Sequence, residues 1–249
     1  MLTKIETISS CPNCGSNQPI GYNFCGRCGQ PNFVIEKEKD EESRRNIKYL
    51  LAYIISLLIM LIAGGFTEDS LFTAIILAVA YAFFDLAFAS IQPRVWNLLL
   101  PKLIHFKPLI AIIIIAIVSG FVVSFVMDNL NYALFGETYS LILPFMESNN
   151  PLLFGIIIIG VFPAFFEELA FRGFVYNNLD KIAGKKSAMW GSTFLFGLVH
   201  FSLLSLIWII PFGLMLAYFR NKYSTLLYGI VGHFTHNTTS VLIEYYRII

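Results

Sequence analysis

Long apolar stretches separated by short polar ones fill the chain from about residue 48 onward. A helix needs roughly 20 consecutive apolar residues to cross the hydrocarbon core of a bilayer, and several of these stretches approach or exceed that length. The pattern therefore predicts an all-α fold, a polytopic transmembrane helical bundle of about seven spans. Six or eight are also compatible, because the fifth predicted span is short and joins the sixth almost directly. The predicted spans are residues 48–66, 70–91, 108–127, 152–178, 187–201, 202–219 and 223–244.

The composition agrees with a membrane protein. Hydrophobic residues make up 57% of the 249 residues and charged residues 13%, whereas a soluble domain carries about 25% charged residues. The formal net charge of +1 is too small to favour a class of binding partner.

The distribution of Lys and Arg predicts the orientation in the membrane. Basic residues in short loops remain on the cytoplasmic side. They precede the first predicted span and recur in alternate loops, while loops 64–70 and 128–150 contain none. Arg247 is the exception to this alternation. We therefore expect a multi-pass protein of the cell membrane with a cytoplasmic N-terminus.

Four cysteines precede the first span, in the segment CPNCGSNQPIGYNFCGRCG. Two CxxC pairs, Cys11 with Cys14 and Cys25 with Cys28, are ten residues apart. Each such turn presents two thiolates, and four thiolates make a tetrahedral zinc site. Two disulfides are the alternative, which a reducing cytoplasm disfavours. We predict a zinc ribbon over residues 8–31 that holds structural zinc and resembles the short ribbons of many microbial membrane proteins.

Residues 32–47 are predicted to form a charged linker, followed by a transmembrane domain over 48–249. The stretch EKEKDEESRRNIK contains five acidic and five basic residues, so it is not a phosphate-binding arm. We expect no nucleic-acid partner. A protein partner, or self-association, is the expected role of the ribbon.

The stretch FFEELAFRGF places three charged residues in the fourth predicted span. Charged side chains inside a bilayer are costly and usually mark function. Glu168 and Arg172 are four residues apart, which allows an intrahelical ion pair, whereas Glu167 points elsewhere. The alternative is that all three lie near the cytoplasmic end of the span and reach the interface.

Two further predicted spans carry histidines on apolar faces. Phe196 and His200 are four residues apart in the fifth span; His233 and Asn237 have the same spacing in the seventh, with His236 beside them. An isolated buried histidine is usually structural, but acid, imidazole and amide groups on three helices favour chemistry. A carboxylate can activate a water for attack on an amide carbonyl, and His and Asn can stabilise the oxyanion.

These residues resemble three motifs of the intramembrane CAAX prenyl protease and bacteriocin-processing family, also called Abi-type proteases. The resemblance covers roughly residues 110–245. The motifs are EExxxR at Glu167, Glu168 and Arg172, FxxxH at Phe196 and His200, and HxxxN at His233 and Asn237.

The resemblance implies an endopeptidase whose cavity opens toward the cytoplasmic leaflet, where it hydrolyses a peptide bond near the membrane face. It implies that Glu167 activates water with the help of His200, and that His233 and Asn237 bind the oxyanion. Glu168 would be a supporting residue together with Arg172.

Metal dependence and substrate stay open at this point. The family is often described as metalloproteases, but the zinc-binding HExxH helix is absent, which favours water activation without a metal. The expected substrate is a peptide or protein, with a prenylated CAAX terminus as one possibility.

The main alternative to an enzyme is a non-enzymatic immunity or scaffold protein that binds a partner through the ribbon. Transport is a weaker alternative, which rests on Asp85, an isolated acidic residue in the second predicted span.

Overall fold

The computed structural model describes residues 8–19, 23–31, 33–67, 70–100, 103–136, 140–200 and 202–248. The basic residues Lys4 and Lys102 lie outside these ranges. The chain divides into two compact units, Met1–Tyr49 and Leu50–Ile249.

The first unit contains a small hairpin. Strands β1 (Ile8–Ser10) and β2 (Asn17–Pro19) pair antiparallel, with Ile8 opposite Pro19. Phe24 and Pro31 form an isolated antiparallel bridge in the second half of the ribbon. Gly15 and Gly29, which each follow a CxxC pair, have φ angles of 67° and 71°, and a glycine adopts this left-handed conformation without steric cost.

Helix α1 (Phe33–Gly64) begins within the segment expected to be a linker and continues without a break into the first span. In its charged part, Arg44 pairs with Asp40 at 2.9 Å on the exposed surface. The polar segment is thus helical, because Glu, Lys and Arg are good helix formers even where nothing apolar covers them.

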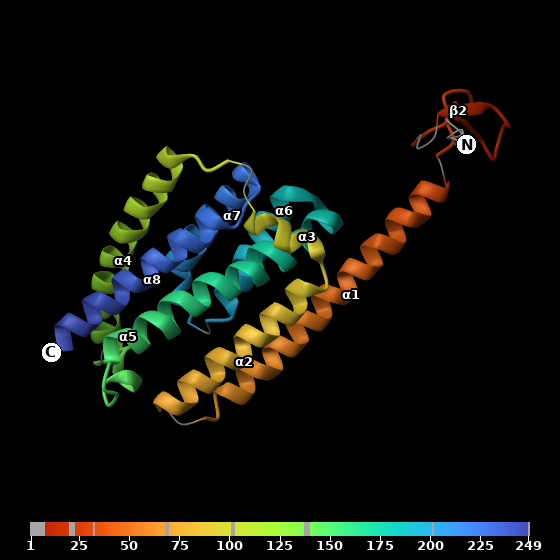
Figure 1. Ribbon diagram of the computed structural model, residues 1–249. Helices are drawn as coiled ribbons and strands as arrows, with labels where there is room; N and C mark the ends of the chain where they lie inside the picture. The colour runs from red at the N-terminus through yellow and green to blue at the C-terminus, as the bar shows by residue number, and fades with distance from the viewer. Residues whose placement is uncertain are drawn as a thin grey trace, which may run out of the picture. The chain divides into compact units, whose positions relative to one another are not determined.

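The second unit is a helical bundle (Figure 1). After α1, its elements are α2 (Leu71–Ser90), α3 (Pro93–Trp96), η1 (Asn97–Leu99), α4 (Phe106–Phe135), η2 (Leu143–Phe145), α5 (Pro151–Gly155), η3 (Ile156–Val161), η4 (Pro163–Val175), α6 (Tyr176–Leu198), α7 (Leu206–Tyr223) and α8 (Leu227–Ile248).

Each predicted span overlaps a helix, which confirms the all-α membrane fold. The fifth and sixth predicted spans also extend into the connection between α6 and α7, in which residue 201 lies outside the described residues. Among the described residues, four helical segments are long and apolar enough to cross a membrane: 40–64, 71–90, 106–135 and 151–198. The last contains both the fourth and the fifth predicted spans. Helices α7 and α8 fall outside this group: α7 carries the polar residues Arg220–Lys222 in its last turn, and α8 buries His233, His236 and Thr239.

Two breaks shape the long segment 151–198. Gly184, with φ 80° and ψ 169°, interrupts α6 and separates the fourth span from the fifth. Upstream, η3 and η4 are π-helical on either side of Pro163. Proline lacks the N–H needed for a regular helical bond, and π-helical turns are frequent at functional sites.

The bundle has two ends of opposite charge. At one end, Thr225 Oγ1 donates to Leu98 O at 2.8 Å, and the Tyr228 hydroxyl bonds the backbone of His105. We call this the basic end, since it carries Arg94, Lys107, Lys181, Lys185, Lys186, Arg220 and Lys222.

At the other end, α8 packs against α4 and α5, and the C-termini of α4 and α8 lie toward the same side of Figure 1. There Glu244 accepts hydrogen bonds from Ser140 and from the backbone of Leu141 and Ile142. We call this the acidic end, since it carries Asp128, Glu147 and Glu244. Arg247, its one basic residue among those described, is paired with Asp128.

Candidate active site

A fully buried ion pair, Glu168 with Arg172, packs behind the residues that line the cavity. Arg172 Nη1 donates to Glu168 Oε1 at 2.9 Å, and both side chains are 0% exposed. Arg172 Nη2 also approaches Gly213 O at 3.4 Å. The four-residue spacing on η4 thus produces the pair that the sequence predicts, and burial makes each partner necessary to the other.

Glycine at position 229 allows α8 to approach this pair closely. A Cβ atom there would lie 2.5 Å from Glu168 Oε2. Glu168 Oε2 itself has no hydrogen-bond partner among the described groups. A side chain at position 229 would therefore displace the carboxylate.

The Phe196 ring contacts the buried ion pair and both site histidines, His200 and His233. The Arg172 guanidinium lies over its ring at 4.1 Å, which is a cation–π contact. The rings of His200 and His233 pack edge-on against it, with centroids at 5.1 and 5.7 Å. Phe196 is thus the packing residue for all three motifs.

His200 has a defined tautomer. Its Nδ1 lies 2.8 Å from the carbonyl oxygen of Phe196. A carbonyl only accepts, so Nδ1 must donate, and the neutral ring keeps the lone pair of Nε2 free. His200 can therefore accept a proton or orient a water through Nε2.

His233 is placed between the two carboxylates. Its Nδ1 lies 3.3 Å from Glu168 Oε1, and its Nε2 lies 4.0 Å from Glu167 Oε2. Because Glu168 Oε1 is the acceptor of the Arg172 N–H, Nδ1 is the donor of the first contact. The free edge of His233 faces Glu167, whose side chain is 29% exposed while that of Glu168 is 0% exposed. Glu167 is therefore the carboxylate that water can reach.

Asn237 lies one turn beyond His233 on α8. Its Nδ2 donates to Ile159 O of η3 at 2.8 Å, a bond that fixes the amide and leaves its second N–H available.

These side chains line one cavity of about 540 Å³. Glu167, His200, His233 and Asn237 are on its wall, together with Phe196. Glu168 and Arg172 are outside the lining and support His233 from behind. The structure thus brings together side chains that are up to 70 residues apart in the sequence. Glu167 comes from η4, Phe196 from α6, His200 from the turn that follows α6, and His233 and Asn237 from α8.

Two cavity residues were not assigned a role from the sequence. His236 is 2% exposed, and its ring packs against those of Trp208 and Phe212, with centroids at 5.0 and 4.6 Å. Neither His236 Nδ1 nor Trp208 Nε1 has a partner among the described groups. His236 was visible beside the third motif, whereas Trp208 stands in an apolar run that gives no chemical signal.

A second cavity of about 220 Å³ lies on the other side of Glu167 and His200. Asp85 is on its wall, only 4% exposed, and accepts a hydrogen bond from Tyr53 at 3.0 Å. Asp85 was noticed in the sequence, but nothing in the pattern of α1 pointed to Tyr53. A buried acid beside the site thus has a fixed donor.

The four ribbon cysteines converge as a metal site requires. All four Sγ atoms lie within 4.8 Å of one another, and the closest pairs are Cys14–Cys25 at 3.6 Å and Cys11–Cys28 at 3.8 Å. Thiolates about 2.3 Å from a tetrahedral ion would be about 3.8 Å apart. All four are free thiols, so the disulfide alternative does not describe this ribbon.

Hydrogen bonds prepare at least one of these thiols for a metal. The Ser16 hydroxyl and the backbone N–H groups of Cys28 and Arg27 lower the pKa of Cys25 from 9.0 to about 6. A thiolate is the form that binds metal. The four cysteines can therefore hold a metal ion.

Residues 149–239 match the model of a protein family, described as Type II CAAX prenyl endopeptidase Rce1-like. No curated protein and no solved structure is significantly similar to the chain. The matched segment contains all three motifs and ends two residues beyond Asn237. It therefore includes the motif residues of the cavity wall, whereas the α4 part of the wall and the ribbon lie outside it. The expected resemblance is thereby confirmed: over residues 149–239 this membrane chain matches the Rce1-like CAAX prenyl endopeptidase family, and the match supports an intramembrane CAAX-type protease.

Proposed function

We propose that the chain is an intramembrane endopeptidase in which Glu167 activates the water that hydrolyses a peptide bond. The observation that carries this proposal is the convergence of Glu167, His200, His233 and Asn237 on one cavity. Interhelical hydrogen bonds are worth only about 1 kcal/mol in membranes, so they are a poor reason to place these groups together. This argument disfavours a purely structural role and with it the non-enzymatic alternative.

In the proposed reaction, a water bound between Glu167 and His200 loses a proton to the Glu167 carboxylate as its oxygen attacks the carbonyl carbon. The C–N bond then breaks, and the proton passes from Glu167 to the departing amine. General-base catalysis of this kind typically contributes about 10²–10⁴ in rate. His200 Nε2 holds the water, because its Nδ1 is committed to Phe196 O.

His233 and Asn237 are the proposed oxyanion donors. Asn237 offers the N–H that Ile159 does not take. With a proton on each ring nitrogen, His233 would offer Nε2–H to the oxyanion while Nδ1–H donates to Glu168 Oε1, 3.3 Å away. Fixed donors of this kind are worth about 10²–10³ in rate each. Glu168 and Arg172 act only as supports.

We also propose that water activation needs no metal. The HExxH pattern is absent from the sequence. Within the described residues, the ribbon is the one place where ligand atoms of three or more His, Cys, Asp or Glu residues converge. The metal of this protein is then zinc held by Cys11, Cys14, Cys25 and Cys28, where it stabilises the ribbon as a surface for a protein partner.

The test is cleavage of a broad set of membrane-tethered peptides, some of them prenylated, by purified protein in lipid. We compare the parent, Glu167→Gln and a matched control, Glu147→Gln, which makes the same change on an exposed loop at the acidic end. The parent and the control are expected to cleave the same peptides, and Glu167→Gln is expected to lose about 10²–10⁴ in rate.

Thermal unfolding of each variant shows whether the loss is chemical. Equal cleavage by the parent and by a folded Glu167→Gln protein would contradict the proposal. If no peptide is cut by any variant, the immunity or scaffold function becomes the better account.

A further inference from the structure

The cavity that holds the motif residues extends toward one end of the bundle. From Glu167 and His233 it continues past Val123 and Asn131 in the second half of α4, and past Ser240 and Glu244 near the end of α8. Its wall also includes Leu141, Ser202 and Ser205 from connecting segments at the acidic end. The lining therefore runs from mid-membrane to the acidic end.

Between the ion pair and the basic end lies a layer of buried side chains. Beneath the ion pair, Phe174, Val175 and Tyr176 are all 0% exposed. Arg220 covers them: its guanidinium lies 3.8 Å from the centre of the Tyr176 ring, and its Nε donates to Arg172 O at 3.1 Å. No described part of the cavity wall lies on the basic-end side of this layer.

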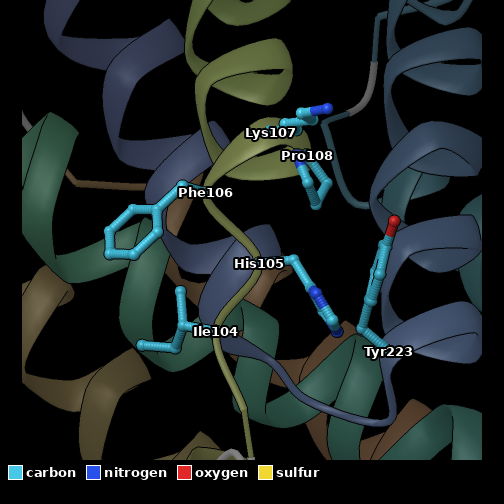
Figure 2. Close-up of a pocket in the computed structure, with 6 residues that line it drawn as sticks. All are labelled: Ile104, His105, Phe106, Lys107, Pro108 and Tyr223. Atoms are coloured by element: carbon cyan, nitrogen blue, oxygen red, sulfur yellow. The ribbon is translucent and has the colours of Figure 1, made fainter.

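The hollow at the basic end is separate from the site. It measures about 550 Å³ and is formed by Ile104–Pro108 and Tyr223. Figure 2 shows the rings of His105 and Tyr223 beside it with Lys107 above, and none of the motif residues lines it. The hollow at the basic end therefore shares no lining residue with the cavity that holds Glu167.

The charge difference between the two ends indicates which side of the membrane each end faces. Lys and Arg concentrate on the cytoplasmic side of membrane proteins, whereas Asp and Glu follow no comparable rule. The seven basic residues of the basic end therefore place it in the cytoplasm. The single basic residue at the acidic end, Arg247, is paired with Asp128.

We propose that the candidate active site opens to the extracytoplasmic face, and that its substrate is a peptide segment presented there, such as the outer end of an exported or membrane-anchored peptide. The substrate part of this inference rests on the proposed endopeptidase function. It replaces the expectation of cleavage near the cytoplasmic face, and a prenylated cytoplasmic C-terminus then becomes an unsuitable substrate.

The polar lining fits such a route. Ser124, Asn131, Ser202, Ser205 and Ser240 offer hydrogen-bonding groups along the way to Glu167. Hydrolysis consumes one water for each bond cleaved, and a polar channel from the aqueous face can supply it.

Labelling in intact cells with a membrane-impermeant maleimide tests the inference without any substrate. All four native cysteines lie in the ribbon, so the parent reports on the N-terminal side. We compare it with Ser202→Cys on the cavity wall, Glu147→Cys on an exposed loop of the same end, and Lys185→Cys at the basic end. Ser202→Cys and Glu147→Cys are expected to be labelled in intact cells, and the parent and Lys185→Cys only after permeabilisation.

Each alternative labelling result would contradict a specific part of the proposal. Labelling of Lys185→Cys but not of Glu147→Cys in intact cells would invert the orientation. Labelling of Glu147→Cys without Ser202→Cys would show that the cavity is closed to that face. Labelling is independent of cleavage, so a protein that labels as expected but cuts no peptide would refute the endopeptidase while the orientation stands.

Discussion

The ribbon and the membrane site each gather four functional side chains, but they do so over very different distances in the sequence. The ribbon takes its cysteines from 18 consecutive residues, Cys11 to Cys28, through two local turns. The membrane site takes Glu167 from η4, His200 from the turn after α6, and His233 and Asn237 from α8. A local site is held by its own turns and ligands, whereas a dispersed one depends on the packing of the bundle. Substitutions should reveal this difference.

The largest expected effect is on the ribbon. Cys25→Ser removes one of four ligands from a site whose metal contributes about 10–16 kcal/mol in comparable zinc-finger peptides, so we expect metal content to fall to near zero. Bound metal is measured after gel filtration. Asn23→Ser introduces the same residue two positions away, at an exposed site, and should retain the metal. Loss of helical content from the bundle in Cys25→Ser would break the comparison, because the ribbon would then no longer be a self-contained site.

The next effect concerns the buried ion pair. Arg172→Met leaves Glu168 without its cation, and breaking a buried pair costs about 3–5 kcal/mol. We expect a folded protein of strongly reduced thermal stability, or none. Arg172→Met together with Glu168→Leu removes both charges and should recover much of the stability. No recovery in the double variant would mean that the arginine contributes mainly through its packing on Phe196.

A smaller loss of stability is expected from a substitution at Gly229, which lies against the Glu168 carboxylate. Gly229→Ala places a Cβ atom 2.5 Å from Glu168 Oε2, so the carboxylate must move. Overpacking of this kind costs about 1–3 kcal/mol. Gly64→Ala is the control, because its nearest contacts are ordinary ones at 3.5 Å. Equal unfolding temperatures of the two variants would argue that α8 is not held close to Glu168.

Features that depend on nearby residues could be predicted from the sequence, whereas features that depend on contacts between distant helices could not. The CxxC pairs, the three motifs and the Glu168–Arg172 spacing are local patterns, and each could be recognised from the sequence. The contacts between helices could not: the Tyr53–Asp85 bond joins α1 to α2, and the His236–Trp208 stacking joins α8 to α7. The all-α membrane bundle was predictable from apolar length, but helix bounds were not, since α1 continues into polar residues and Gly184 divides the fourth predicted span from the fifth.

The smallest expected effect comes from the exposed counterpart of the buried pair. Asp40 and Arg44 have the same four-residue spacing as Glu168 and Arg172, but their side chains are 58% and 74% exposed. Exposed pairs at this spacing contribute about 0.3–0.5 kcal/mol. Arg44→Met should therefore leave the unfolding temperature almost unchanged, and a loss comparable to that of Arg172→Met would show that burial is not what separates the two pairs.

The most direct test of the central claim is peptide cleavage by the Cys25→Ser protein, with and without Glu167→Gln, in the presence of a chelator. If the hydrolytic chemistry resides in the membrane site and uses Glu167 rather than a metal, the metal-free Cys25→Ser protein cleaves at close to the parental rate, and adding Glu167→Gln abolishes cleavage. Loss of cleavage in a folded Cys25→Ser protein, or its persistence in the double variant, would contradict the account.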